Sequence, residues 1–91
     1  MANTSYNAVP VGDTATLIIA SNSNRKGLLI VNNSAVTVYI GPDASITKDN
    51  AIPILASGTF MDTGLQEAWR SAVYGIVVTG TADVRYWEYG Q

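Results

Sequence analysis

The sequence predicts an all-β protein, an antiparallel β-sandwich or a jelly-roll-like domain. Three observations support this prediction. β-branched and aromatic residues cluster in runs of roughly four to eight, and Gly, Pro, Asn, Asp and Ser separate these runs at short intervals. A helical hydrophobic period is nearly absent. The length of 91 residues suits one compact core.

Short turns separate the predicted strands. The strand that reaches Gly41 ends there because Pro42 cannot donate to a ladder and Asp43 can bond its own backbone. Residues 66–73 (QEAWRSAV) allow a short helix at most before the next strand. The predicted strands are residues 14–20, 27–32, 36–41, 51–55, 59–61, 72–79 and 82–89.

Two hairpins are expected between neighbouring strands. In the first, residues 28–31 pair with residues 36–40 across a short loop that contains Asn and Ser. In the second, residues 74–79 pair with residues 83–89, and Gly80 permits the positive φ that a tight turn needs.

Residues 1–12 differ in character from the rest of the chain, since their apolar residues are isolated and Pro10 lies among them. Alone, such a segment does not offset the entropy of ordering. It is expected to be either a frayed tail or a flexible N-terminal arm that orders on a neighbouring surface. The predicted organisation is therefore an arm at residues 1–12 and one β-sandwich domain at residues 13–91.

Strands with apolar residues on both faces are the most informative feature. Strands of this kind are covered on both sides. We expect Leu28 and Ile30, with Val38, to lie in the sandwich core. Leu29 and Tyr39 should be covered by a loop, the arm or another subunit, and a well-covered monomer is the alternative. An error of one residue in register would exchange the two faces.

Composition narrows the class of function. Only 13% of residues are charged and the net charge is −2, so the chain tolerates close packing against copies of itself or a partner. Nucleic-acid binding needs clustered basic residues, and only Arg25 and Lys26 are adjacent. No secretory signal is visible, and no apolar run approaches the roughly 20 residues that span a bilayer.

Catalytic and metal-binding patterns are not found in the sequence. It has neither Cys nor His, which removes the commonest nucleophile–base pairs and metal ligands. Asp43, Asp49 and Asp62 lie in predicted turns, and no pair of carboxylates is evident that would divide acid and base roles. Residues 43–50 lack the spacing of a calcium loop. We therefore expect no enzyme activity and assign no catalytic, cofactor-binding or metal-binding residue; no small-molecule substrate is expected.

Aromatic residues leave a second interpretation open. Trp69, Trp87 and Tyr89 offer flat faces with polar edges, as carbohydrate sites do, although a role in the core or in a protein interface is the simpler interpretation.

Three segments share an order of residues with known proteins. They are residues 24–41 (NRxxLLIxNxSxxxxYIG), 54–58 (ILxxG) and 72–88 (AVYGIxxxGTAxVxxxE). Together they resemble a small β-domain of tailed-bacteriophage virion proteins, which occurs in head decoration or cement proteins and in head-fibre and tail-associated proteins. The likeness implies structural roles: a turn at Asn24 and Arg25 would fix the entry into the strand at residues 28–32, and Asn32 and Ser34 would satisfy the hairpin loop.

The resemblance implies a non-enzymatic module that often forms trimers. The expected function is that of a capsid decoration protein on the phage head, made in the bacterial cytoplasm and bound at capsomer junctions to the major capsid protein and to itself as a homotrimer. A receptor- or glycan-binding module of a fibre or tail, using Trp69, Trp87 and Tyr89, is the alternative. The expected subunit or capsid contacts are Asn3, Tyr6, Val9, Val11, Leu29 and Tyr39.

Overall fold

The structure, a computed structural model, describes residues 3–62 and 69–90. Strands and their connections make up these ranges, which contain no helix. The strands are β1 (Asn3–Val11), β2 (Thr16–Ile19), β3 (Arg25–Asn32), β4 (Val38–Gly41), β5 (Ile52–Ile54), β6 (Thr59–Asp62), β7 (Val73–Ile76) and β8 (Ala82–Gly90).

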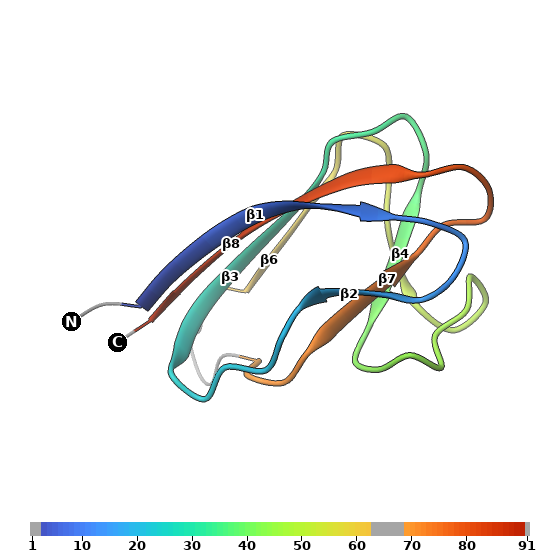
Figure 1. The fold of residues 1–91 in the computed structure, drawn as a ribbon. Coiled ribbons are helices and arrows are strands. Elements are labelled where there is room, and N and C mark those ends of the chain that lie inside the picture. The colour runs from blue at the N-terminus through green and yellow to red at the C-terminus, as the bar shows by residue number, and fades with distance from the viewer. Residues whose placement is uncertain (1–2, 63–68, 91) are drawn as a thin grey trace.

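The strands form two four-stranded antiparallel sheets (Figure 1). Sheet A has the order β1-β8-β3-β6, and sheet B has the order β2-β7-β4-β5. The hydrophobic core lies between them and takes side chains from both sheets. The prediction of an all-β antiparallel sandwich is confirmed, because each apolar sheet face is buried against the other.

Both predicted hairpins are wrong, although every predicted strand is present. β3 lies in sheet A and β4 in sheet B, and likewise β8 lies in sheet A and β7 in sheet B. The connections after β3 and β7 therefore cross from one sheet to the other. This arrangement turns the apolar faces of consecutive strands toward each other across the core. Gly80 does adopt a positive φ of 80° in the second of these connections.

The expected N-terminal arm is also corrected, because residues 3–11 form strand β1 of the domain itself. β1 pairs with β8 in one unbroken antiparallel register from Asn3 to Val11. Val11 is fully buried, and the Ser5 hydroxyl donates to an oxygen of Glu88 at 2.8 Å. Isolated apolar residues suffice here because β8 supplies the ladder and β1 needs to cover only the edge of the core.

The inner faces agree with the predicted alternation. Leu28, Ile30 and Val38 are fully buried, and Ile40 nearly so. Leu29, between two buried neighbours on β3, is only half-buried. The choice of core face on β3 and β4 is thus confirmed. The short helix expected at residues 66–73 falls partly outside the described residues, and residues 69–73 are not helical.

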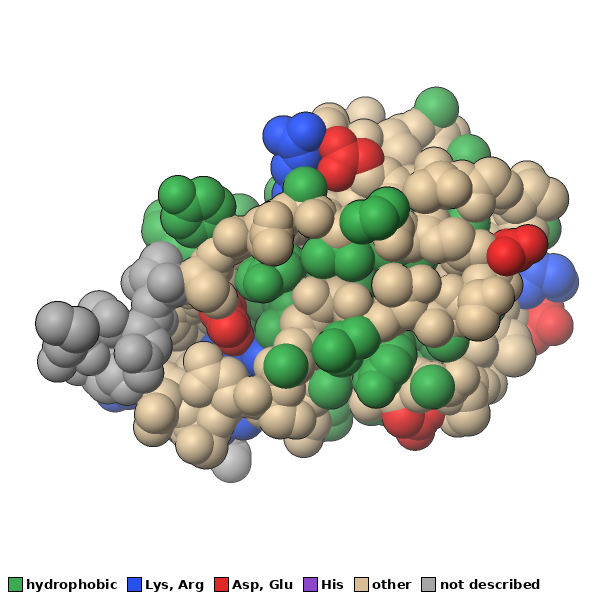
Figure 2. Space-filling model, viewed as in Figure 1, with side chains coloured by type: hydrophobic (Ala, Val, Ile, Leu, Met, Phe, Trp, Pro, Cys, Tyr) green, Lys and Arg blue, Asp and Glu red, His purple; other side chains and the backbone are tan. Residues whose placement is uncertain are grey.

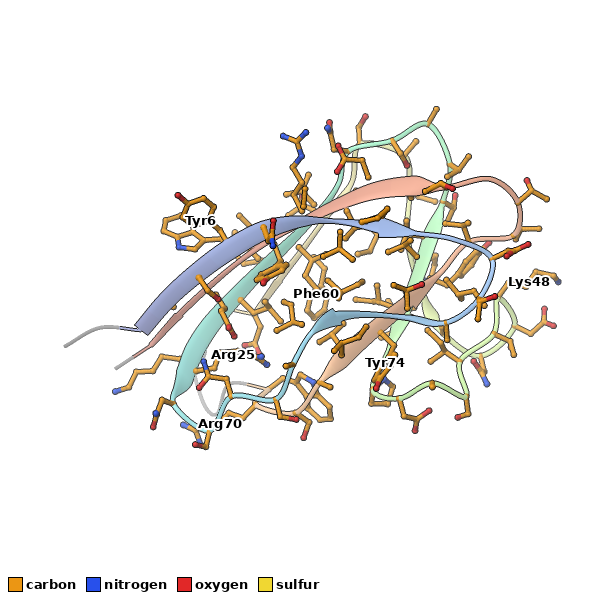
Figure 3. All side chains as sticks on the ribbon, viewed as in Figure 1. Tyr6, Arg25, Lys48, Phe60, Arg70 and Tyr74 are labelled. Carbon is orange, nitrogen blue, oxygen red and sulfur yellow. The ribbon has the colours of Figure 1, made fainter. Side chains whose placement is uncertain are left out.

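A buried arginine joins the two sheets at the start of β3. Nε of Arg25 donates to Glu88 of β8 at 2.6 Å, and the side chain of Arg25 is fully buried. Its terminal nitrogens donate to the carbonyls of Trp69 (2.8 Å), Ser71 (3.0 Å) and Ala20 (2.7 Å). Figure 3 shows this residue at the base of β3 beside Arg70. One guanidinium therefore fixes segments of both sheets, as its fork of donors permits.

A neutral network holds the other end of β3. The amide nitrogen of the buried Asn32 donates to the carbonyls of Val36 (2.6 Å), Ile54 (3.0 Å) and Leu55 (3.1 Å). The Ser34 hydroxyl donates to the amide oxygen of Asn32 at 2.6 Å. Asn32 and Ser34 thus make hydrogen bonds within the crossover from β3 to β4, and Asn32 also connects this crossover to the end of β5.

Candidate interaction surface

The carboxylates of the turns bond to local partners. Asp43 accepts the backbone N–H and the hydroxyl of Ser45 at 2.9 and 2.5 Å, and these hydrogen bonds lower the pKa of Asp43. Asp49 pairs with Lys48 at 3.0 Å. In the described ranges, no group of three or more Asp or Glu is placed to hold a metal ion. None of the described segments is a helix long and apolar enough to cross a membrane.

The outer face of sheet A carries a row of apolar side chains that crosses all four strands. Tyr6 of β1 lies opposite Trp87 of β8, which lies opposite Leu29 of β3, and Leu29 lies opposite Met61 of β6. We call these four residues the outer row. Tyr6 is 79% exposed, Met61 60% and Trp87 50%. Figure 3 shows Tyr6 projecting from β1 on the side away from the core. Adjacent apolar side chains of this size are unusual on a solvated sheet.

An aromatic pair extends the outer row along β8. The rings of Trp87 and Tyr89 lie 6.0 Å apart at 56°. The Tyr89 ring covers Gly27 of β3 so closely that a Cβ at this position would overlap it. The glycine therefore lets the aromatic ring lie flat against the sheet, which widens the apolar area beside the outer row.

One ion pair of β8 lies on this face. Asp83 and Arg85 of β8 form an ion pair at 3.0 Å, and the amide of Asn33 donates to Asp83 at 3.1 Å. The hydrogen bonds from Arg85 and then from Asn33 lower the pKa of Asp83. Arg85 lies between Ala8 and Val31 in the register, so its neighbours in that row are uncharged. Figure 2, which views the sandwich from the side of the edge strands β1 and β2, shows charged side chains as scattered groups among hydrophobic and other ones.

The outer face of sheet B is a second apolar surface. Tyr39 of β4 lies between Ile76 of β7 and Pro53 of β5, and Leu17 of β2 lies opposite Tyr74. Leu17 is 44% exposed, whereas Tyr39, Ile76 and Tyr74 are half-buried. The expectation that Leu29 and Tyr39 share one covered face is wrong, because β3 and β4 belong to different sheets and these side chains lie on opposite sides of the sandwich.

The structure separates the expected contact residues. Tyr6 and Leu29 both belong to the outer row. Asn3 begins β1, the strand that carries Tyr6, and lies opposite Gly90. Val11 is fully buried in the core, so it offers no contact surface, whereas Val9 packs against the core and is only partly buried. Sequence reasoning missed Met61. Its alternation with Phe60 marks an outward position, but only the pairing of β6 with β3 places it beside Leu29.

The aromatic residues of the glycan interpretation are separated too. Trp69 does not belong to the Trp87–Tyr89 ring pair: it lines a separate pocket of about 250 Å³ together with Phe60. The Trp69 indole N–H already donates to the carbonyl of Ala72 at 3.1 Å. The pocket lining is apolar: Ile40, Gly41, Pro42, Ile52, Phe60, Trp69 and Val73. A sugar needs convergent polar groups, which this lining lacks.

Fold and surface define an antiparallel β-sandwich domain with an exposed aromatic face. No protein-family model, curated protein or solved structure matches the chain. The resemblance to phage virion proteins therefore stays a prediction.

Proposed function

We propose that the chain is a non-enzymatic structural protein of a phage virion, a decoration protein that binds the outer shell of the head at capsomer junctions. The observation that carries the proposal is the outer row, which places Tyr6, Trp87, Leu29 and Met61 side by side across sheet A. The partner is the major capsid protein, with further copies of the chain beside it. The resemblance of residues 24–41, 54–58 and 72–88 to virion proteins supports the same proposal.

The composition of the outer row suits protein contact. Tyr, Trp and Met are enriched in the buried centres of protein interfaces, and charged residues are depleted there. Removing about 400 Å² of apolar surface from water contributes on the order of 10 kcal/mol before the cost of association. Repeated over the many equivalent junctions of a shell, even a weak contact of this kind adds substantial stability.

Binding to heads that lack the chain tests the proposal. Trp87→Ala, at the centre of the outer row, is expected to reduce occupancy on purified heads at least about tenfold, because a central aromatic anchor contributes most of such a contact. Leu17→Ala is the matched control, since Leu17 is similarly exposed but lies on sheet B. Unchanged occupancy of the Trp87 variant, or equal loss with both variants, would contradict this use of sheet A.

A glycan-binding module of a fibre or tail is the second candidate. The exposed Trp87–Tyr89 pair favours it, since tilted aromatic rings can receive the apolar face of a sugar. A glycan array with the intact chain tests it, and any hit should quench tryptophan fluorescence. Trp87→Ala should abolish the hit and Trp69→Phe should keep it, because Trp69 lies in a separate pocket. An array without hits excludes the candidate.

A further inference from the structure

The four edge strands of the sandwich are unequally protected against pairing with another chain. Natural sheets guard edges by shortness, proline, bulges or charge. β2 is short and its register is irregular, β5 is short and contains Pro53, and β6 is short and ends at Asp62. β1 is nine residues long, unbroken and without a charged residue, and Pro10 stands only near its end. β1 is therefore the edge most open to a further strand.

The main-chain groups that point to the open side of β1 follow from the register. Pro10 lies opposite Asp83, and the Asp83 carbonyl accepts the N–H of Asn33 on the β3 side at 2.9 Å. Asp83 thus directs its backbone groups away from β1, and antiparallel pairing repeats this every second residue. The N–H and C=O groups of Thr4, Tyr6 and Ala8 consequently face outward from the sheet edge. In the single chain the Ala8 N–H donates to the side-chain oxygen of Asn7 at 2.8 Å, a local bond that a carbonyl of a pairing strand would replace.

We propose that β1 pairs antiparallel with β1 of a second copy of this chain about a two-fold axis at Tyr6. In this register Thr4 of one copy lies opposite Ala8 of the other, and the outward groups form about six main-chain hydrogen bonds. Sheet A becomes one continuous sheet through both copies. Pro10 lies beyond these bonds, so its missing N–H costs none of them.

A second copy suits this edge because the edge is complementary to itself. β1 carries no charge, so two β1 strands meet without like-charge repulsion, and the net charge of −2 per chain adds little. The two-fold axis also brings the two Tyr6 side chains together, and each is 79% exposed in the single chain. The outer row then runs without a break from Met61 of one copy to Met61 of the other. The Asp83–Arg85 pair lies farther along β8, away from the axis.

Light scattering of the purified chain tests the pairing, which does not depend on the proposed function. The wild type is expected to have the mass of a dimer. Tyr6→Lys should give a monomer, because like charges then face each other at the axis. Ala8→Pro should do the same by removing an outward N–H, while leaving the bonds of β1 to β8 in place. Met61→Lys is the matched control: it charges the same sheet face at the far edge and should remain a dimer.

Amide hydrogen exchange gives a readout on the wild type itself. In a single chain, the amide of Tyr6 faces water and exchanges quickly, and that of Ala8 is bonded to the exposed side-chain oxygen of Asn7, which protects it little. The amides of Asn7 and Val9 face β8 and are protected. In the dimer all four should be protected, and dilution should release Tyr6 and Ala8 first. Melting curves confirm that the variants are folded. A monomeric or trimeric wild type, or a monomeric Met61→Lys variant beside a dimeric Tyr6→Lys variant, would overturn the proposal.

Discussion

The two faces of sheet A are built from the same strands and both are apolar, yet they have different physical roles. On β3 the inward residues Leu28 and Ile30 are fully buried, while Leu29 between them is half-buried beside the exposed Trp87 and Met61. Hydropathy alone does not distinguish the faces. Their difference shows that the inner face supplies the buried core against sheet B, whereas the outer face stays exposed, and this exposure is what the proposed association rests on.

The largest expected effect concerns the charged group at the base of the inner face. Arg25→Met should cost about 3–5 kcal/mol in the free energy of unfolding, because it leaves Glu88 without its buried cation. It also removes donors from three carbonyls, including that of Ala20 on the side of sheet B. Urea unfolding followed by tryptophan fluorescence measures the loss.

Two further variants show whether burial is the cause. Lys26→Met, at the exposed neighbour of Arg25, should change the free energy of unfolding by about 0.5 kcal/mol or less. The double variant with Arg25→Met and Glu88→Met should recover part of the single variant's loss, since no unpaired charge stays buried. If Arg25→Met lowered the free energy of unfolding no more than Lys26→Met does, the hydrogen bonds of Arg25 would not stabilise the fold.

A matched pair of leucines compares the two faces directly. Leu28→Ala should cost about 3 kcal/mol, because it removes buried methyl groups and leaves a cavity in the core. Leu29→Ala, at the next residue on the same strand, should cost about 1 kcal/mol in a single chain, since Leu29 is only partly removed from water. Denaturant midpoints with equal slopes give both values. Equal losses of stability from Leu28→Ala and Leu29→Ala would contradict the distinction between the inner and outer faces.

The alternation of side chains along each strand made its inward and outward faces predictable. The order of the strands in the two sheets was not predictable in this way. The positions of strands and the inward choice of Leu28, Ile30 and Val38 follow from local runs and a period of two residues. The partner of each strand depends on contacts between distant parts of the chain. Neighbouring apolar runs suggested hairpins, but β3 pairs with β8 and β6 and forms no ladder with β4.

The same reason explains what sequence reasoning missed at the interaction surface. β1 has too few apolar residues to indicate a strand by itself, and its partner β8 is the last strand of the chain. Arg25 and Lys26 look alike in the sequence, yet Arg25 is buried because Glu88, far along the chain, faces it. The row from Tyr6 to Met61 exists only once the order β1-β8-β3-β6 is known.

The smallest expected effect lies on the outer face of sheet A, at the Asp83–Arg85 ion pair. The pKa of Asp83 is lowered by the hydrogen bond from Arg85 and then by that from Asn33, so the folded state favours the carboxylate. A lowered folded pKa stabilises the protein above the unfolded value and loses this contribution as the pH falls through the folded one. Asp83→Asn should therefore lower the melting temperature slightly at neutral pH.

The difference in melting temperature between Asp83→Asn and the wild type should shrink as the pH falls below 3.8, the ordinary pKa of this carboxyl. It should disappear once Asp83 is protonated in the folded protein. Salt should reduce it as well, because the pair is exposed and screened. Melting curves across this pH range, with and without salt, measure both dependences. A large, salt-insensitive effect would mean that Asp83 and Arg85 are covered in the assembled protein, which would extend the contact surface from the outer row along β8.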